Sequence, residues 1–314
     1  MSGGTVVVTG ANGTLGLAFI ASALKDFPIH HLILTVRNPS QKDINTAKLH
    51  ALLSKIPDAR YTIHTLDLST LAAVRTFATL ITTQITNGEL PIAAIICNAF
   101  AWSLTSGLKF TPDGSMDKTN GRIIGMSSDS HDPGLNALEV FPPAIPADIE
   151  ELAKPPPDAP RGEVGRGFQR YGVSKLCVVM YTDPALKGIT AIALDPGGLP
   201  DSRAMSNDTP VAWGILMKYF LNPLQPVLKF AVPTLRKSGA AEKDLVQLGL
   251  GEVYRGANGY YIMSKPGKSS ADSYDEAKCA RLWERSVVWS GIEPAGTVGV
   301  MPVLSRSPYM NFRK

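Results

Sequence analysis

Three polar side chains in the middle of the chain have the types and spacing of an acid–base catalyst. Tyr171 and Lys175 lie four positions apart, so in a helix they share one face. A phenol titrates near ~10 in water, and a neighbouring ammonium lowers that pKa because it stabilises the phenolate. Ser128 stands where a short apolar run ends, and its hydroxyl could hold a substrate oxygen. Together they could exchange a proton with a carbonyl or an alcohol, although Tyr and Lys at this spacing more commonly form a plain surface pair.

A glycine-rich turn near the N-terminus is the second chemical signal. The segment TGANGTLG, residues 9–16, lies between a continuous apolar run and a helical pattern. Glycines there let the backbone turn tightly and approach a pyrophosphate, whose charge the helix N-terminus stabilises. The segment therefore predicts a dinucleotide site, with an ordinary tight turn as the alternative.

The residue that follows the second apolar run indicates which dinucleotide is bound. NAD-binding proteins place a carboxylate there for the ribose hydroxyls, whereas an arginine accommodates the 2′-phosphate of NADP. In this chain the run ends Thr35-Val36-Arg37-Asn38, without a carboxylate. Arg37 thus favours NADP(H), unless it is only a solvated surface charge.

These residues need a scaffold, and the chain alternates short β-branched runs with helical patterns. That alternation predicts an α/β fold of the Rossmann type, a doubly wound parallel sheet in a single domain over residues 1–314. The expected strands are Thr5–Thr9, Leu32–Val36, Tyr61–Leu66, Ile92–Cys97, Arg122–Met126, Ile189–Leu194 and Tyr260–Met263. The expected helices are Leu15–Leu24, Gln41–Lys55, a segment capped by Ser69, Tyr171–Tyr181 and Tyr274–Val288.

Composition excludes several other classes of protein. The formal net charge is +4 and charged residues make up 18% of the chain, without the basic stripe that a nucleic-acid-binding protein needs. Three distant cysteines and five histidines have neither disulfide nor metal-ligand spacing. We therefore expect no metal site. The N-terminus lacks the pattern of a signal peptide, so we expect a cytoplasmic protein.

The most apolar stretch, residues 211–232, is interrupted by two lysines and two prolines. It therefore does not predict a transmembrane helix. It could still lie on a membrane surface or over an apolar ligand.

With these elements in order, the chain resembles the short-chain dehydrogenase/reductase family along almost its whole length. The landmarks are TGANGTLG, Asp67-Leu68, Asn98-Ala99, Ser127-Ser128, YGVSK at residues 171–175, and Asp195-Pro196-Gly197-Gly198. The segments GYYIMS and LWERS look like the branch of retinol dehydrogenases and protochlorophyllide reductases, in a fungal-type form. That branch reduces apolar molecules with NADPH, so the resemblance implies an NADPH-dependent oxidoreductase of an apolar ketone, aldehyde or alcohol, as in secondary metabolism.

Carried over by position, the resemblance gives these residues roles. Ser128 would polarise the substrate oxygen, Tyr171 would donate or accept the proton, and Lys175 would lower the pKa of Tyr171 and hold the nicotinamide ribose. Other residues would bind the phosphates, the adenine and its ribose, or would border the nicotinamide of the cofactor. The full expected set is Gly10, Asn12, Gly13, Thr14, Leu15, Gly16, Arg37, Asp67, Asn98, Tyr171, Lys175, Pro196, Gly197 and Ser202.

Departures from the family pattern bear on activity and assembly. Thr14 and Phe100 stand where the family usually has glycine, and residues 100–121 show no sustained helical stripe. The family's fourth helix, with the Asn of its catalytic tetrad, would then be missing, and Asn120 is a poor substitute. The helix expected at Tyr171 would end after about three turns.

These two helices build the family's dimer interface, so the usual dimer is doubtful. The shortening is either genuine diversification or a gene model that omits coding sequence. A catalytically weak or inactive NADP-binding sensor is the alternative function.

Two segments are expected around the substrate. Residues 132–170 are rich in proline, which stiffens a loop and prevents helix continuation, and they predict an ordered lid. Residues 199–240 include Trp213, Tyr219, Phe220 and Phe230. Apolar walls of this kind suit a hydrophobic substrate, unless these side chains only close the core beneath the sheet edge.

Overall fold

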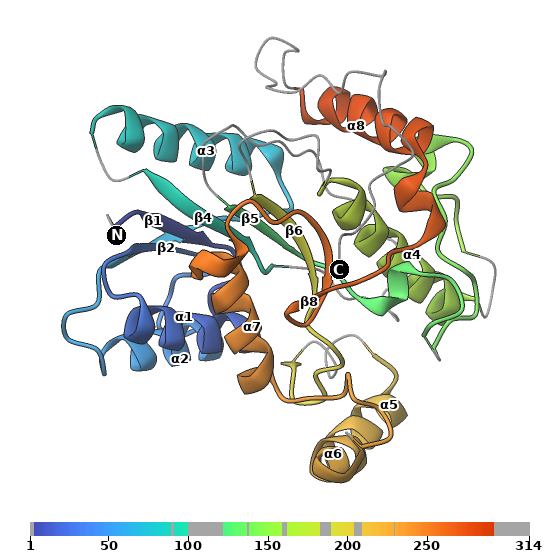
Figure 1. The fold of residues 1–314 in the computed structure, drawn as a ribbon, viewed down its shortest axis with the longest axis horizontal. Helices are drawn as coiled ribbons and strands as arrows, with labels where there is room; N and C mark the ends of the chain where they lie inside the picture. The colour runs from blue at the N-terminus through green and yellow to red at the C-terminus, as the bar shows by residue number, and fades with distance from the viewer. Residues whose placement is uncertain are drawn as a thin grey trace.

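The computed structural model describes residues 3–88, 91–99, 122–136, 138–158, 162–182, 190–203, 209–228 and 230–291, except the side chains of residues 211, 217 and 218. Within these residues one sheet has the strand order β3-β2-β1-β4-β5-β6-β7-β8. Neighbouring strands are parallel as far as β7, and β8 pairs antiparallel with β7. Helices lie on both faces of the sheet (Figure 1). The predicted Rossmann-type α/β fold is confirmed.

The elements have the following bounds. The strands are β1 (Thr5–Val8), β2 (His31–Val36), β3 (Tyr61–Thr65), β4 (Ile92–Cys97), β5 (Arg122–Met126), β6 (Thr190–Asp195), β7 (Gly259–Ile262) and β8 (Lys265–Pro266). The helices are α1 (Thr14–Asp26), α2 (Ile44–Leu53), α3 (Leu71–Thr86), α4 (Glu163–Met180), α5 (Val211–Leu216), α6 (Asn222–Leu228), α7 (Ser238–Leu250) and α8 (Glu276–Ser290). A π-helical segment, Met217–Leu221, joins α5 to α6.

The apolar core is divided by the sheet because side chains alternate along each strand. In β1, Val6 and Val8 belong to the cluster that contains buried residues of α1, α2 and α7. Val7 points to the other face, where it packs with Ile81 of α3. The central strands are thus covered on both sides, which leaves their carboxyl ends as the edge where ligands bind in such folds.

The helix that carries Tyr171 and Lys175 differs from its predicted form. It begins at Glu163 rather than at Tyr171, so the expected length of about three turns is wrong, while its end at Met180 agrees with the prediction. Its first turns include glycines that disfavour helix by propensity. Packing overrides that propensity, because Phe168 is buried and Gly165 lies against Val140 and Phe141.

Two smaller expectations also differ. Thr70, not Ser69, caps α3, and its side chain accepts a hydrogen bond from the backbone N–H of Ala73. The antiparallel strand β8 was not expected, because its two residues carry no alternating pattern. The segment 100–121, which includes Asn120 and for which we expected no fourth helix, lies outside the described residues.

The proline-rich segment packs on α4 and α8 rather than standing free. Its residues Ile145 and Ile149 join a buried cluster with Leu176 of α4 and Leu282 of α8. Arg281 of α8 donates hydrogen bonds to two backbone oxygens of the same segment, at 3.0 and 3.1 Å. The described residues of the segment are therefore held against two helices, and their role as a lid stays a prediction. Its last part is not loop, since α4 has already begun there.

Candidate active site

The turn between β1 and α1 holds the predicted phosphate-binding residues. Gly10 has a φ of +61°, and a Cβ added there would lie 3.0 Å from the Cα of Ala99. A Cβ on Gly16 would lie 2.7 Å from the carbonyl oxygen of Gly10. Side chains at these positions would force the helix and the two strand ends apart, so this packing requires glycine. The turn consequently presents bare backbone to a ligand.

Helix α1 begins directly after this turn, with Gly13 as its N-cap. Gly13 supplies no side-chain oxygen, and the first turn of α1 carries no Asp or Glu, so the positive end of the helix dipole faces no carboxylate of its own helix. Thr14 Oγ1 accepts a hydrogen bond of 3.2 Å from the backbone N–H of Arg203, which brings the loop with Ser202 beside the helix start. The Leu15 side chain is buried in the core, so Leu15 can offer a ligand only its backbone.

Two asparagines of the predicted set shape this turn from inside the protein. Asn98, which follows β4, donates from Nδ2 to the backbone oxygens of Thr9 and Gly10, at 3.1 and 3.0 Å. Asn12 donates from Nδ2 to Thr46 Oγ1 of α2, at 3.0 Å. Both amides therefore hold the backbone of the turn, and neither is extended freely into a cofactor site.

Arg37 and Asp67 follow β2 and β3 and lie beside each other. The Arg37 side chain is 82% exposed, and its Nε lies 3.8 Å from Asp67 Oδ1. A hydrogen bond from the backbone N–H of Ser69 is the main cause that lowers the pKa of Asp67, and Arg37 adds to that effect. The guanidinium thus has a carboxylate on one side and solvent around most of its surface.

Ser128, Tyr171 and Lys175 come together beyond the end of β5. A side-chain hydrogen bond joins Ser128 to Tyr171. Lys175 Nζ lies 5.2 Å from the centroid of the Tyr171 ring and donates to the backbone oxygen of Met126, at 2.9 Å. Lys175 is only 5% exposed, which is rare for a lysine and typical of one that serves a site.

Two local contacts hold α4 against the end of β5. Ser127 Oγ donates to the backbone oxygen of Lys175 at 3.2 Å. A Cβ on Gly172 would lie 2.3 Å from the backbone oxygen of Ser130, so this position needs glycine for the helix to approach. The glycine within YGVSK therefore sets the distance between Tyr171 and Ser128.

Burial dominates the electrostatics of this group. Burial raises the pKa of Tyr171. The hydrogen bond with Ser128 offsets part of this rise, and the charges of Asp195 and Asp129 add to it. Desolvation of the phenol outweighs the effects that favour its anion, and the expectation that Lys175 lowers the pKa of Tyr171 stays a prediction. Burial also lowers the pKa of Lys175 to about 8, against the opposing effect of Asp195. Near pH 7 the site holds a neutral phenol beside a largely protonated amine.

The turn after β6 brings Pro196 and Gly197 to the same edge of the sheet. Gly197 has a φ of +81°, and a Cβ there would lie 2.3 Å from the backbone oxygen of Thr234. Arg236 Nε donates to the backbone oxygen of Pro196 at 2.7 Å. The turn is thus fixed by the segment that precedes α7.

A buried polar group beside this turn was not predicted as functional; we call it the Asp195 cluster, comprising Asp195, Tyr260 and His131. Tyr260 Oη donates to Asp195 Oδ2 at 3.1 Å, and the backbone N–H of Gly197 donates to Asp195 Oδ1 at 2.8 Å. The His131 ring lies 4.6 Å from that of Tyr260, and its Nδ1 lies 2.6 Å from the backbone oxygen of Ser128. The cluster therefore links Ser128 to the turn after β6.

Replacing Tyr260 with Phe tests this link. The variant leaves one buried carboxylate oxygen of Asp195 without its donor, so we expect a loss of about 1–3 kcal/mol in unfolding free energy at pH 7. The pKa of Asp195, already raised by burial, rises further. A raised carboxyl pKa means that the folded state binds more protons, so stability falls as pH rises past the unfolded pKa. The deficit of Tyr260→Phe should therefore shrink towards acidic pH.

Urea unfolding at several pH values measures this effect. Tyr254→Phe is the matched control, because Tyr254 Oη donates to the backbone oxygen of Ser264, at 3.0 Å, and not to a carboxylate. Its deficit should not vary with pH. A Tyr260→Phe deficit that is equally flat would show that Asp195 is not held as a carboxylate by this bond.

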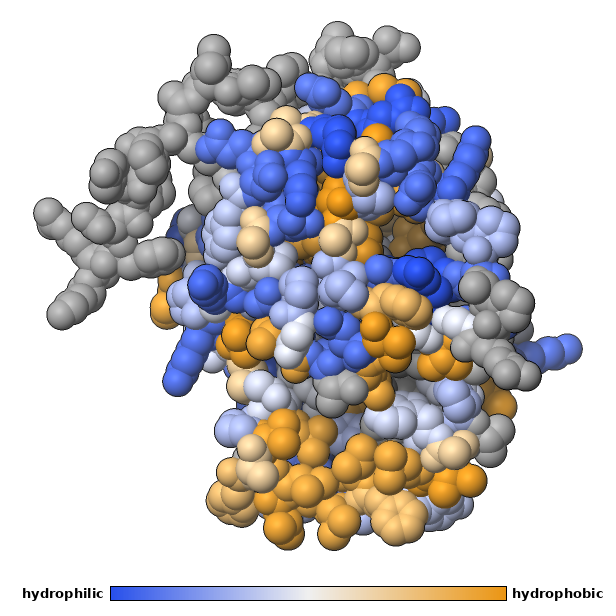
Figure 2. All heavy atoms as spheres, turned by 90° about the vertical axis from the view of Figure 1, so that its right-hand side faces the viewer, coloured by the Kyte–Doolittle hydropathy of each residue, from blue (hydrophilic) through white to orange (hydrophobic). Residues whose placement is uncertain are grey.

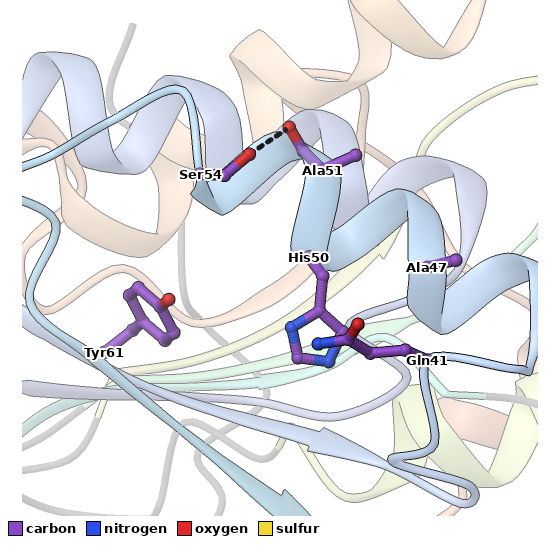
Figure 3. A pocket seen from close by; sticks show the side chains of 6 residues that line it. All are labelled: Gln41, Ala47, His50, Ala51, Ser54 and Tyr61. Carbon is purple, nitrogen blue, oxygen red and sulfur yellow. Dashed lines mark hydrogen bonds between the residues drawn. The ribbon is translucent and has the colours of Figure 1, made fainter.

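A separate surface hollow of about 440 Å³ lies at the opposite edge of the sheet. It is lined by Gln41, Ala47, His50, Ala51, Ser54 and Tyr61. Figure 3 shows these side chains between α2 and the start of β3, where Tyr61 opens the strand. No residue of the predicted site lines this hollow. In the described part of the chain, no group of three His, Cys, Asp or Glu side chains is placed to hold a metal ion.

Comparison with known proteins places this chain among dehydrogenases. The model of the AcuH dehydrogenase domain matches residues 203–298. The short-chain dehydrogenase iccH of Talaromyces variabilis is 29% identical over 363 aligned positions, which cover 94% of this chain and 98% of the relative. Protochlorophyllide reductase A of Hordeum vulgare is 24% identical, over 90% of this chain and 79% of its own.

A solved structure shares the fold. A short-chain dehydrogenase/reductase of Saccharomyces cerevisiae superposes with a TM-score of 0.52 at 15% identity, covering 84% of this chain and 97% of the other. At that identity the likeness shows the fold alone. The site must therefore be argued from its own residues.

Proposed function

The chain belongs to the short-chain dehydrogenase/reductase family of oxidoreductases, and we propose that it transfers hydride between NADP(H) and the carbonyl or alcohol carbon of an apolar small molecule. One observation carries the proposal: Ser128, Tyr171 and Lys175 meet at the sheet edge where the glycine-rich turn also lies. A protein that only binds a dinucleotide has no need of a buried lysine beside a phenol. Reduction is the favoured direction, since the neutral phenol is a proton donor.

The residues around the first turn fit a dinucleotide phosphate. Glycines at positions 10 and 16 let the turn pack tightly without side chains, and α1 starts without a carboxylate in its first turn. Arg37 would meet the 2′-phosphate, with Asp67 beside it for the adenine. When bound, the reduced nicotinamide would supply the hydride.

The protein's own residues would manage the proton. Ser128 Oγ, which donates to Asp129 Oδ1 at 3.0 Å, would be redirected to the substrate oxygen and orient it towards the phenol. Tyr171 would then give its proton to that oxygen as negative charge develops there. The protonated Lys175, whose Nζ is anchored on the backbone of Met126, would stabilise the tyrosinate that remains. Its low pKa of about 8 predicts that reduction slows above that pH.

Turnover of a panel of apolar ketones and aldehydes tests the function, with loss of NADPH absorbance as the signal. Oxidation of NADPH with formation of the matching alcohol supports the proposal. Tight NADPH binding without turnover of any carbonyl across the panel would favour a sensor instead.

Arg37→Ala tests the choice of nucleotide. An arginine–phosphate contact contributes roughly 1.5–3 kcal/mol, so we expect the Kd for NADPH to rise by about tenfold or more while the Kd for NADH stays nearly constant. Fluorescence titration of both nucleotides measures the change. Arg60→Ala is the control, because Arg60 lies exposed before β3, at the other edge of the sheet. NADH binding as tight as NADPH in the unmodified protein would contradict the assignment.

The compartment and the oligomeric state of the protein are also proposals. Cys97, Cys177 and Cys279 are free thiols, which fits a reducing compartment such as the cytoplasm. Among the described residues no helix is long and apolar enough to cross a bilayer. The proline-rich segment and α8 cover part of α4, one of the helices that form the family's usual dimer interface. That cover supports a monomer.

A further inference from the structure

The segment between β6 and α7 exposes a continuous apolar surface. We define this α5–α6 surface by Ile215, Leu216, Tyr219, Phe220, Leu224 and Val227, whose exposed fractions range from 39% to 68%. Figure 2 shows it as a band of hydrophobic atoms at the foot of the molecule, where Figure 1 places α5 and α6. Patches of this kind mark sites of interaction on proteins that are otherwise polar outside.

The polar side of this segment is turned to the protein. Gln225 of α6 is 7% exposed, and its Nε2 donates to the backbone oxygen of Leu235 at 3.0 Å. An amide is thus buried while the aromatic and branched side chains beside it face outward. The exposure of these six apolar side chains argues against the alternative that they only close the core, while a role as walls of a substrate site stays a prediction.

Charge distinguishes between the occupants such a surface could take. Residues 209–237 contain no Asp or Glu, and all their charges are Lys or Arg. Arg236 pairs with Asp244 of α7 at 2.5 Å, whereas Lys237 is exposed. Two copies of this chain that met through this surface would bring like charges together. The positive charges would add no binding free energy for an uncharged apolar substrate. A surface of anionic lipid offers both an apolar interior and negative headgroups.

We propose that the α5–α6 surface binds the face of an anionic phospholipid bilayer, with its apolar side chains inserted below the headgroups. The elements are short and contain Pro223 and Pro226, so they lie in the interface rather than cross it. Tyr219, with a polar tip on an apolar ring, suits the headgroup level.

The surface is joined to the candidate active site. The backbone N–H of Gly198 donates to the oxygen of Thr234 at 3.0 Å, and that of Arg236 donates to the oxygen of Gly198 at 2.9 Å. The segment that ends the apolar surface is thus paired with the turn after β6. If the proposed function holds, an apolar substrate dissolved in the bilayer would reach the site without passing through water. Lipid binding itself does not depend on that function.

Co-sedimentation of the full chain with phosphatidylcholine vesicles, with and without phosphatidylserine, tests the proposal. We expect binding only when phosphatidylserine is present, and weaker binding as salt is added. Phe220→Ser combined with Val227→Ser should reduce the bound fraction by about tenfold or more, because two inserted side chains are lost. Ile44→Ser combined with Val253→Ser removes two even more exposed apolar side chains elsewhere, and should leave binding unchanged. Thermal unfolding verifies that both variants are folded.

Three results would overturn the proposal. One is equal binding of the two double variants. Another is a dimer in light scattering that only the Phe220→Ser and Val227→Ser variant dissociates, which would assign the surface to a second copy. The third is that the unmodified protein does not bind anionic vesicles, while the Phe220→Ser and Val227→Ser variant loses activity towards a soluble carbonyl. That result would assign the α5–α6 surface to the substrate. Because vesicle binding is read without turnover, failure of the proposed function would leave this test intact.

Discussion

Tyr171→Phe should lower kcat for carbonyl reduction by roughly 10²–10⁴-fold, the usual contribution of a positioned proton donor. The ring stays in place, so packing against Phe168, with ring centroids 6.1 Å apart, is retained. Only the hydroxyl is lost, and with it the proton and the hydrogen bond to Ser128. The Kd for NADPH should change by no more than about twofold, because the nucleotide is held mainly by the turn after β1 and by Arg37.

Single-turnover kinetics with saturating NADPH separates the chemical step from binding. Tyr181→Phe is the control, because Tyr181 caps the same helix and bonds Ser286 rather than a residue of the site. It should unfold more easily but react at the normal rate. A Tyr171→Phe variant that retains more than about a third of the rate would remove Tyr171 from the chemistry.

Much of this site was predictable because its geometry is local. Tyr171 and Lys175 share a helix face by their spacing alone, and the glycines of the first turn follow from the strand and helix around them. The polar residues at strand ends also meet where a parallel sheet requires them to meet. The sequence therefore predicts the fold class and the edge of the sheet at which these residues meet.

The parts that could not be predicted depend on contacts between distant segments. Asp195 meets Tyr260 only because β6 and β7 pair in a register that sets Asp195 opposite Ile262. The direction of the Tyr171 pKa shift depends on how deeply the phenol is buried, which no spacing reveals. The start of α4 was missed because Gly165 has low helix propensity, and only its packing against the proline-rich segment explains it.

Lys175→Met should make the protein more stable and almost inactive. Burial lowers the pKa of Lys175 from 10.5 to about 8, so the folded protein carries this charge at a cost of roughly 3 kcal/mol near pH 7. Methionine has a similar length and no charge to desolvate, although it loses the hydrogen bond to Met126. We expect a net gain of about 1–3 kcal/mol in unfolding free energy, since the lost bond offsets part of the relief.

The pH dependence gives this prediction its sharpest form. Between about pH 8 and 10.5 the unfolded chain keeps the proton that the folded chain has released, so the unmodified protein becomes more stable as pH rises through that window. Lys175→Met has no group that titrates in this window, so its gain in unfolding free energy over the unmodified protein should shrink towards pH 10.5.

Lys48→Met, on the exposed face of α2, is the control and should change neither stability nor rate. Reduction by Lys175→Met should slow by about 10²-fold or more, because no cation remains to stabilise the tyrosinate. If Lys175→Met is less stable than the unmodified protein at pH 7, the contacts of the ammonium stabilise the folded state by more than its desolvation costs. If the variant is stable and fully active, Lys175 has no role in the mechanism.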